Sequence, residues 1–162
     1  MIRLVLFAAA MAATSATAFA QQPSIKRSGA DQSPISATVA LPADARLVYV
    51  SGTVPDAIQP DAPQGSVERF GDTETQTRSI IGKIEKLLVA EGLGLGDIVM
   101  MRVFLVAPPG TTRMDFAGMM RGYSDYFGTP KQPNKPARST MQVAGLVDPG
   151  WLAEIEVTAA RR

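Results

Sequence analysis

One arginine and two carboxylates in the last third of the sequence are the residues best suited to chemistry. Arg138 opens a β-prone stretch over 138–144, and Glu154 and Glu156 lie in a second one over 152–159. An Asp-Pro-Gly turn sequence separates the stretches, which predicts a β-hairpin. The two glutamates should share one face of their strand. Because glutamate is depleted in strands, that face meets either water or a functional site.

Arg138 and Glu154 each have two interpretations. A guanidinium at a strand entrance can hold a carboxylate through two parallel hydrogen bonds, which a lysine would do less specifically. The alternative for Arg138 is a surface arginine that pairs with a nearby acid. Glu154 could belong to a solvated strand face, or it could hold or activate a water molecule beside a substrate bound by Arg138. If Arg138 binds a substrate carboxylate and Glu154 activates a water molecule, the two residues could hydrolyse an electrophilic carbon without a metal or cofactor.

The composition excludes several kinds of chemistry, because the sequence has no cysteine and no histidine. Disulfides, thiolate nucleophiles, histidine-based triads and Cys/His zinc sites are ruled out. Any acid–base step must use Asp, Glu, Lys, Tyr, backbone groups or water. The formal net charge is +1 and no basic block precedes the terminal Arg161-Arg162, which argues against a nucleic acid partner.

The N-terminal 20 residues have the pattern of a secretory signal peptide. Arg3 precedes an apolar run that ends in Ala18-Phe19-Ala20, so cleavage is expected before Gln21. An uncleaved anchor is the alternative, which the shortness of the run disfavours. We therefore expect an exported, periplasmic protein without stable membrane insertion after processing. A flexible lead-in over 21–33 and a single domain over 34–162 should follow the signal.

Apolar and β-branched runs predict three further strands, at residues 35–41, 46–51 and 98–106. The first two should form a hairpin. Residues 55–71 are rich in Pro, Gly and Asp, which predicts a long irregular loop that could line a binding site or contact a partner.

Two helices are predicted between the strands. The first begins at a capping box of Thr73 and Gln76 and stops at Gly92, and the second runs from about Met114 to Phe127. The order β-β-α-β-α-β-β predicts an α+β domain in which both helices cover one face of a mainly antiparallel sheet.

Several stretches of the sequence resemble one protein family. They are Pro136-Ala137-Arg138-Ser139, Gln142-Val143-Ala144-Gly145-Leu146, Glu154-Ile155-Glu156-Val157-Thr158-Ala159 and Val50-Ser51-Gly52. Together they are similar to the pattern of the RidA (YjgF) family of enamine/imine deaminases. The resemblance covers about residues 34–160.

The resemblance implies a chorismate-mutase-like α+β subunit, assembled as a homotrimer with clefts between neighbouring subunits. Arg138 would bind the substrate carboxylate, Glu154 would position the attacking water, and Glu156 would be structural. The other residues expected to contact the substrate are Ser51, Thr140, Met120 and Ile35. The implied substrates are short 2-imino or 2-amino-2-enoic acids, released as 2-oxo acids and ammonia, and no cofactor or metal is implied.

The sequence departs from the family pattern at three places. A tyrosine common in the deaminases is replaced by Ile35 or Ser36, an asparagine by Met120, and a cysteine by Thr140. The first two changes make the cleft more apolar, which favours a bulkier imine or binding without turnover. Two alternatives to a deaminase therefore stay open: a trimer that only binds small carboxylates, and a holdase-like trimer that acts through exposed apolar surface.

Overall fold

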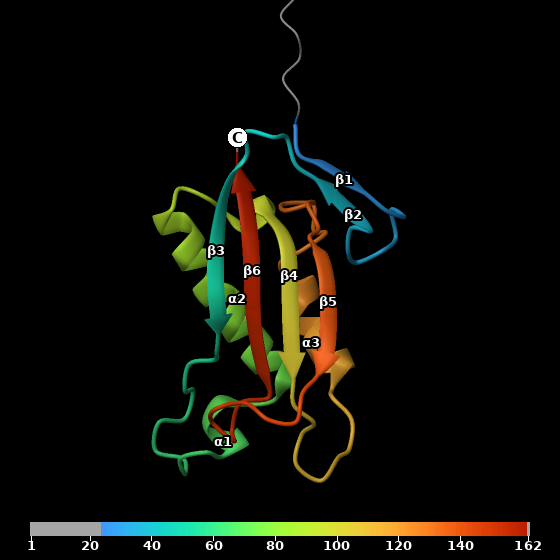
Figure 1. The fold of residues 1–162 in the computed structure, drawn as a ribbon. Helices are drawn as coiled ribbons and strands as arrows, with labels where there is room; N and C mark the ends of the chain where they lie inside the picture. Colours follow the sequence, from blue (N-terminus) through green and yellow to red (C-terminus); the bar gives the residue numbers. More distant parts are fainter. Residues whose placement is uncertain (1–23, 162) are drawn as a thin grey trace, which may run out of the picture.

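A computed structural model describes residues 24–161, so the predicted signal peptide lies outside the described residues. The main sheet has four strands in the order β3-β6-β4-β5 (Figure 1). Their bounds are β3 Arg46–Thr53, β4 Ile98–Leu105, β5 Ala137–Gln142 and β6 Ala153–Arg161. β6 is antiparallel to β3 and β4, whereas β5 is parallel to β4. The predicted mainly antiparallel sheet is confirmed.

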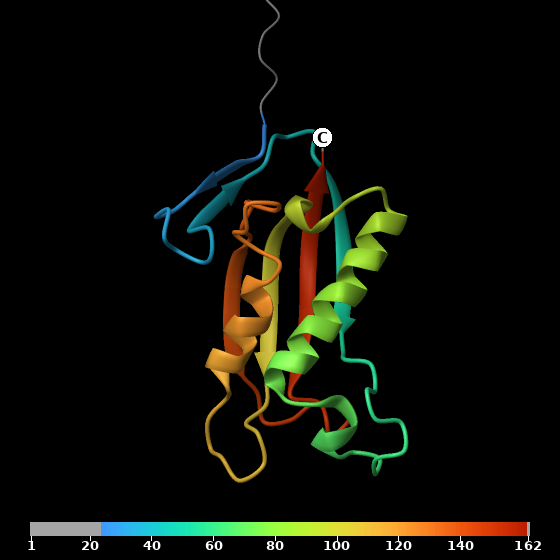
Figure 2. The ribbon, with the colours of Figure 1, turned by 180° about the vertical axis from the view of Figure 1, so that it is seen from behind.

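Helices α2 (Thr73–Ala90) and α3 (Phe116–Ser124) pack together on one face of this sheet, as predicted (Figure 2). Helix α3 lies in the connection between the parallel strands β4 and β5, which need such a crossover. Two short elements complete the helical part, α1 (Val67–Phe70) and the 3-10 turn η1 (Leu95–Asp97). Within residues 24–161, no helix has the length and apolar character that crossing a bilayer requires.

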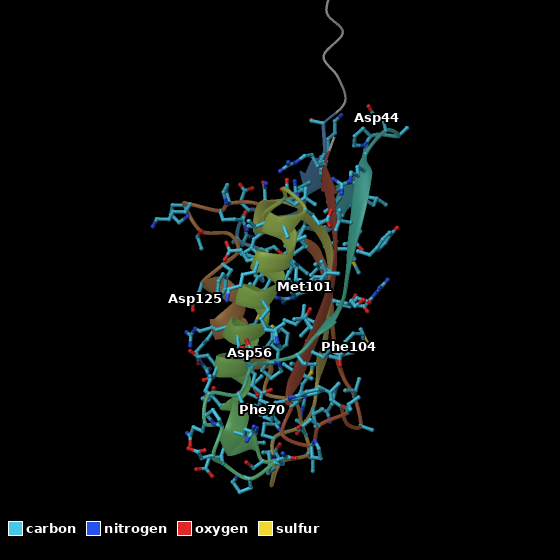
Figure 3. The ribbon with its side chains drawn as sticks, turned by 90° about the vertical axis from the view of Figure 1, so that its left-hand side faces the viewer. Asp44, Asp56, Phe70, Met101, Phe104 and Asp125 are labelled. Atoms are coloured by element: carbon cyan, nitrogen blue, oxygen red, sulfur yellow. The ribbon has the colours of Figure 1, made fainter. Side chains whose placement is uncertain are left out.

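The core lies between the helices and the sheet. Its fully buried side chains include Ile80, Ile81, Ile84, Leu88, Met101, Val103, Leu105 and Ile155. In the edge-on view, Met101 lies on the helix side of the sheet and Phe104 on the other side (Figure 3). We call these the helix face and the open face. Tyr49, 75% exposed, belongs to the open face, because it pairs with Thr158, which in turn faces away from the core.

The helix ends differ in part from the prediction. Asp72, not Thr73, caps α2, because its side chain accepts a hydrogen bond from the Thr75 backbone N–H at 2.8 Å. The predicted capping box of Thr73 and Gln76 is therefore wrong. Gly92 ends the helix as predicted, with a φ of 72° that favours glycine.

Helix α3 is shorter than the predicted span. Asp115 accepts a hydrogen bond from the Gly118 N–H at 2.8 Å and so sets the start at Phe116. After Ser124 the chain continues in turns to Gly128, whose φ is 71°.

Both predicted hairpins are wrong. Strand β4 lies between β5 and β6, so these two strands do not pair. Strand β4 is the strand whose side chains are most consistently buried, and the central position covers both of its edges. The strand at β2 (Thr38–Ala40) pairs with β1 (Lys26–Ser28) instead of β3. Since β1 falls in the predicted lead-in over 21–33, that prediction is corrected for these three residues.

The β1–β2 hairpin is tied to the body of the domain at several points. The Arg27 guanidinium donates to the Gly96 carbonyl at 2.9 Å, and the Ser36 N–H donates to the Pro136 carbonyl at 3.0 Å. Pro136 directly precedes β5, so these bonds bring Ile35, between the two hairpin strands, close to the start of β5.

Candidate active site

Arg138 and Thr140 lie on the helix face of β5. In the β4–β5 register Arg138 pairs with Met101, and Thr140 pairs with Val103. Both partners are fully buried under the helices, and paired residues of neighbouring strands share a face. The side chains of Arg138 and Thr140 therefore point towards α3.

The guanidinium of Arg138 is surrounded by aromatic rings and thioether sulfurs. Its Cζ lies 4.3 Å from the ring centroid of Tyr123 and 6.0 Å from that of Phe116. Its nitrogens contact the Sδ atoms of Met120 at 3.1 Å and Met119 at 4.0 Å, and thioethers are weak acceptors. Burial lowers the pKa of Arg138, but a guanidinium stays charged at neutral pH. No ion pair of Arg138 occurs within residues 24–161, so the surface-pair interpretation does not apply there.

Three other predicted residues lie around Arg138 or beside its contacts. Met120 touches the guanidinium directly. The hydroxyl of Thr140 is buried without a hydrogen-bond partner in the described part of the chain. Ile35 is half-buried and follows Pro34, whose carbonyl accepts a hydrogen bond from the Tyr123 hydroxyl at 3.0 Å. We call Arg138, Met120, Thr140 and Ile35 the arginine half-site.

Glu154 lies on the opposite, open face of the sheet. In the β4–β6 register Glu154 pairs with Phe104, and Glu156 pairs with Arg102. Glu156 forms an ion pair with Arg102 at 2.5 Å, which agrees with a structural role. Among residues 24–161, Glu154 has neither a hydrogen-bond partner nor an ion-pair partner, so its carboxylate is free to bind a ligand or water.

A bulge in β3 makes room for Glu154. The β3–β6 register shifts between Val50 and Thr53, so that Ser51 and Gly52 together face a single residue of β6. A Cβ atom on Gly52 would lie 1.8 Å from Oε1 of Glu154, so the carboxylate occupies space that only glycine leaves open. We call Ser51, Gly52 and Glu154 the glutamate half-site.

The open face is hollowed next to the glutamate half-site. The hollow has a volume of about 300 Å³, and its walls include Tyr49, Ser51, Met100, Arg102, Glu156 and Thr158. It is lined by Ser51 but by no residue of the arginine half-site.

The structure therefore brings the predicted site residues into two groups and does not bring the groups together. Arg138 and Glu154 face opposite sides of the same sheet. Residue-type reasoning also missed Gly52 and Tyr123 as site residues. Gly52 is part of the Val50-Ser51-Gly52 stretch that resembles the family, and this stretch was the available signal. Tyr123 lies on the apolar side of the second predicted helix, a pattern that predicts core packing.

Comparison with known proteins identifies the family. The model of the endoribonuclease L-PSP family matches residues 32–161, which is most of the chain. Solved structures of the YjgF family share the fold. The chain belongs to this RidA/YjgF family, and the predicted fold class is confirmed.

Individual relatives give the range of similarity. TdcF of Escherichia coli K12, provisionally named a reactive intermediate deaminase, is 34% identical over 115 residues, covering 71% of this chain and 79% of TdcF. RutC family protein PH0854 of Pyrococcus horikoshii is 32% identical over 113 residues, covering 70% of this chain and 78% of that protein. The crystal structure of E. coli TdcF with bound serine has a TM-score of 0.56 at 25% identity and covers 85% of this chain and 99% of TdcF. The E. coli YjgF gene product has a TM-score of 0.55 at 28% identity, covering 72% of this chain and 81% of that chain.

Proposed function

We propose that the protein is a hydrolytic deaminase of short 2-imino and 2-amino-2-enoic acids, with its cleft between neighbouring subunits of a homotrimer. The observation that carries the proposal is that Arg138 and Glu154, which have no ion-pair partner within residues 24–161, lie on opposite faces of one sheet. Two such faces meet only when one subunit packs against the next. The relationship to TdcF, a named reactive intermediate deaminase, supports the choice of reaction.

Arg138 would bind the substrate carboxylate. In the free protein its Nη2 donates to the Met120 sulfur, a weak acceptor that a carboxylate can replace at little cost. A carboxylate would accept two parallel hydrogen bonds from the guanidinium. That contact orients the neighbouring C=N carbon for attack.

Glu154 of a neighbouring subunit would act on the water molecule. It accepts a proton as the water oxygen forms a bond to the imine carbon, and the imine nitrogen takes up a proton to give a carbinolamine. Glu154 then helps to move the hydroxyl proton to the amine nitrogen. The C–N bond breaks, and the products are a 2-oxo acid and ammonia. Glycine at position 52 would leave the space that the Glu154 carboxylate needs at the open face.

The proposed location is the periplasm, on the basis of the pattern in residues 1–20. An imine lives briefly in water. An oxidase or lyase that releases 2-imino acids must therefore act close to the deaminase.

The test is the Arg138→Ala variant in a protein that keeps its fold and its assembly. Release of 2-oxo acid and ammonia would be followed from 2-iminobutanoate generated in the assay. Losing a buried charge-assisted contact costs about 2–5 kcal/mol, so kcat/KM should fall by roughly 30-fold or more. Arg46→Ala is the matched control, because Arg46 is a largely exposed arginine that pairs with Glu91. Equal activity of Arg138→Ala and the wild type would contradict the proposal.

A binding protein without turnover is the second candidate. It is favoured by the apolar surroundings of Arg138, whose guanidinium donates to two methionine sulfurs, those of Met119 and Met120. Thermal stabilisation by 2-oxo acids that is lost in Arg138→Ala, without ammonia release from any imine in the wild type, would select this candidate.

A further inference from the structure

We propose that Tyr123 is a positioning residue of the arginine half-site, which fixes both the plane of the Arg138 guanidinium and the chain segment at Ile35. The inference rests on the proposed function, because it takes Arg138 to be the group that binds the substrate carboxylate. Tyr123 itself is 1% exposed and would not touch the substrate.

Of the two aromatic rings that contact the Arg138 guanidinium, the ring of Tyr123 is the nearer. The distance from Arg138 Cζ to the ring centroid is 4.3 Å, well inside the range of a cation–π contact. The ring is itself held by Phe127, stacked at a centroid distance of 4.6 Å and an interplanar angle of 17°. The methionine sulfurs are weak acceptors on flexible side chains, so they define the guanidinium plane less well.

The hydroxyl of Tyr123 holds a second wall of the same half-site. It donates a hydrogen bond to the carbonyl of Pro34 at 3.0 Å. Next along the chain are Ile35 and Ser36, and the Ser36 hydroxyl donates to the Lys135 carbonyl at 2.6 Å. One buried side chain of α3 thus contacts β5 through Arg138 and the β1–β2 hairpin through Pro34.

This arrangement matters for carboxylate binding because two parallel hydrogen bonds require the guanidinium plane to match the carboxylate plane. An arginine without a planar support would lose rotational freedom on binding. Tyr123 removes that freedom before the substrate arrives, so it should act mainly on KM.

The first part of the experiment compares Tyr123→Phe with Tyr123→Leu. Phenylalanine keeps the ring and loses only the hydrogen bond to the Pro34 carbonyl, so KM should rise by at most about threefold. Leucine removes the ring as well and should raise KM about tenfold with a smaller change in kcat. Tyr126→Leu is the matched control. Its hydroxyl donates to the Arg78 carbonyl at 3.4 Å, and the ring that supports Arg138 belongs to Tyr123, not to Tyr126.

The second part is a double-mutant cycle with Arg138→Ala. If Tyr123 acts through Arg138, Tyr123→Leu should cause no further loss of kcat/KM in the Arg138→Ala background. An equal loss in both backgrounds would overturn the inference and leave Tyr123 as a structural residue. If Arg138→Ala lowers kcat/KM and Tyr123→Leu does not, the inference fails but the proposed function stands. If Arg138→Ala is as active as the wild type, the proposed function fails.

A measurement on the folded wild type keeps the inference testable if Tyr123→Leu does not fold. The side-chain protons of Arg138, assigned by their absence from Arg138→Ala, should show an upfield ring-current shift in the NMR spectrum. The shift should persist in Tyr123→Phe. Random-coil shifts for these protons would mean that the guanidinium does not rest on the ring.

Discussion

The guanidinium of Arg138 is half-buried without an opposite charge in the described part of the chain. A charge that loses its water normally needs a partner, because desolvation is costly. The Tyr123 and Phe116 rings supply part of the compensation through their negative faces. An anionic ligand, such as the carboxylate of the proposed substrate, would supply the rest of the compensation.

Tyr123 should make the protein less stable as the pH rises above about 10. Burial raises the pKa of its phenol to about 12, with a smaller opposing effect of the Arg138 charge. A tyrosine in the unfolded chain titrates near pH 10, so between about pH 10 and 12 the unfolded state gives up its proton first. Each pH unit in this window should then lower the free energy of unfolding by up to about 1.4 kcal/mol, and the contribution is fully present below it. Urea unfolding on both sides of about pH 10 would measure this slope, which should be shallower in Tyr123→Phe.

Gly52→Ala should abolish activity at little cost in stability. The added methyl would overlap the Glu154 carboxylate, and the nearest atoms are the end of a flexible side chain that can swing away. Without that carboxylate in place, kcat should fall by about 100-fold or more, as expected for loss of a general base. Gly82→Ala is the control, because a Cβ there meets no atom of residues 24–161 within 4 Å. Full activity of Gly52→Ala would mean that the observed position of Glu154 is not the working one.

The residue types of the candidate site could be predicted from the sequence, but the faces they occupy could not. Alternation along β6 correctly placed Glu154 and Glu156 together on the open face. Whether Arg138 and Glu154 lie on the same face depends on the order and register of the strands. The residue types of a turn do not determine either. The predicted hairpin would have set β5 directly beside β6, whereas β4 separates them.

At the scale of elements, helix α2 holds the chain segment that leads into β6. Gln76 is fully buried, and its Nε2 donates to the carbonyls of Gly71 and Gly150, both at 2.9 Å. Its Oε1 accepts from the Leu152 N–H at 2.7 Å. Because Leu152 directly precedes β6, this amide fixes the start of the strand that carries Glu154.

Gln76→Leu should therefore destabilise the fold strongly. It would leave a buried N–H and buried carbonyl groups without partners, which costs about 1–3 kcal/mol for each group left unsatisfied. Denaturant unfolding should show a loss of about 3 kcal/mol. Glu85→Gln, on an exposed position of the same helix, should change the free energy of unfolding by less than about 0.5 kcal/mol. A loss below about 1 kcal/mol for Gln76→Leu would show that water can replace the amide.

Most elements could be predicted from local pattern, whereas their pairing could not. The apolar runs of α2 and β4 are long enough to identify both elements. The Asp-Pro-Gly turn does form, with the Gly150 N–H donating to Asp148 Oδ1 at 2.8 Å, but it lies within a connection between strands that are not neighbours. Strand β1 has three polar or charged residues and becomes visible only through its pairing with β2.

At the scale of the whole molecule, the two half-sites cannot form one site within a single subunit. Arg138 faces the helices and Glu154 faces away from them. A cleft that uses both must take one from each of two neighbours. In a closed trimer every subunit would then contribute to two clefts.

Subunit mixing tests this arrangement directly. Arg138→Ala and Glu154→Ala proteins should each keep only a few per cent or less of wild-type activity as homotrimers. After unfolding and refolding in equal amounts, about a quarter of the clefts should receive both native residues, so about a quarter of wild-type activity should return. Mixing two batches of Arg138→Ala is the control. No recovery in correctly sized mixed trimers would place both residues of a working site in the same subunit.

The position of β6 in the sheet has a consequence for how the chain acquires its fold. β6 is the last strand in the sequence, yet it lies between β3 and β4, and its final residue in the register, Arg161, pairs with Arg46 at the start of β3. A growing polypeptide that already contains β3, β4 and β5 still lacks the strand that joins them. The four-stranded sheet can therefore form only after β6 has been synthesised. Because β6 pairs with β3, which is distant in the sequence, the formation of the sheet should be slow.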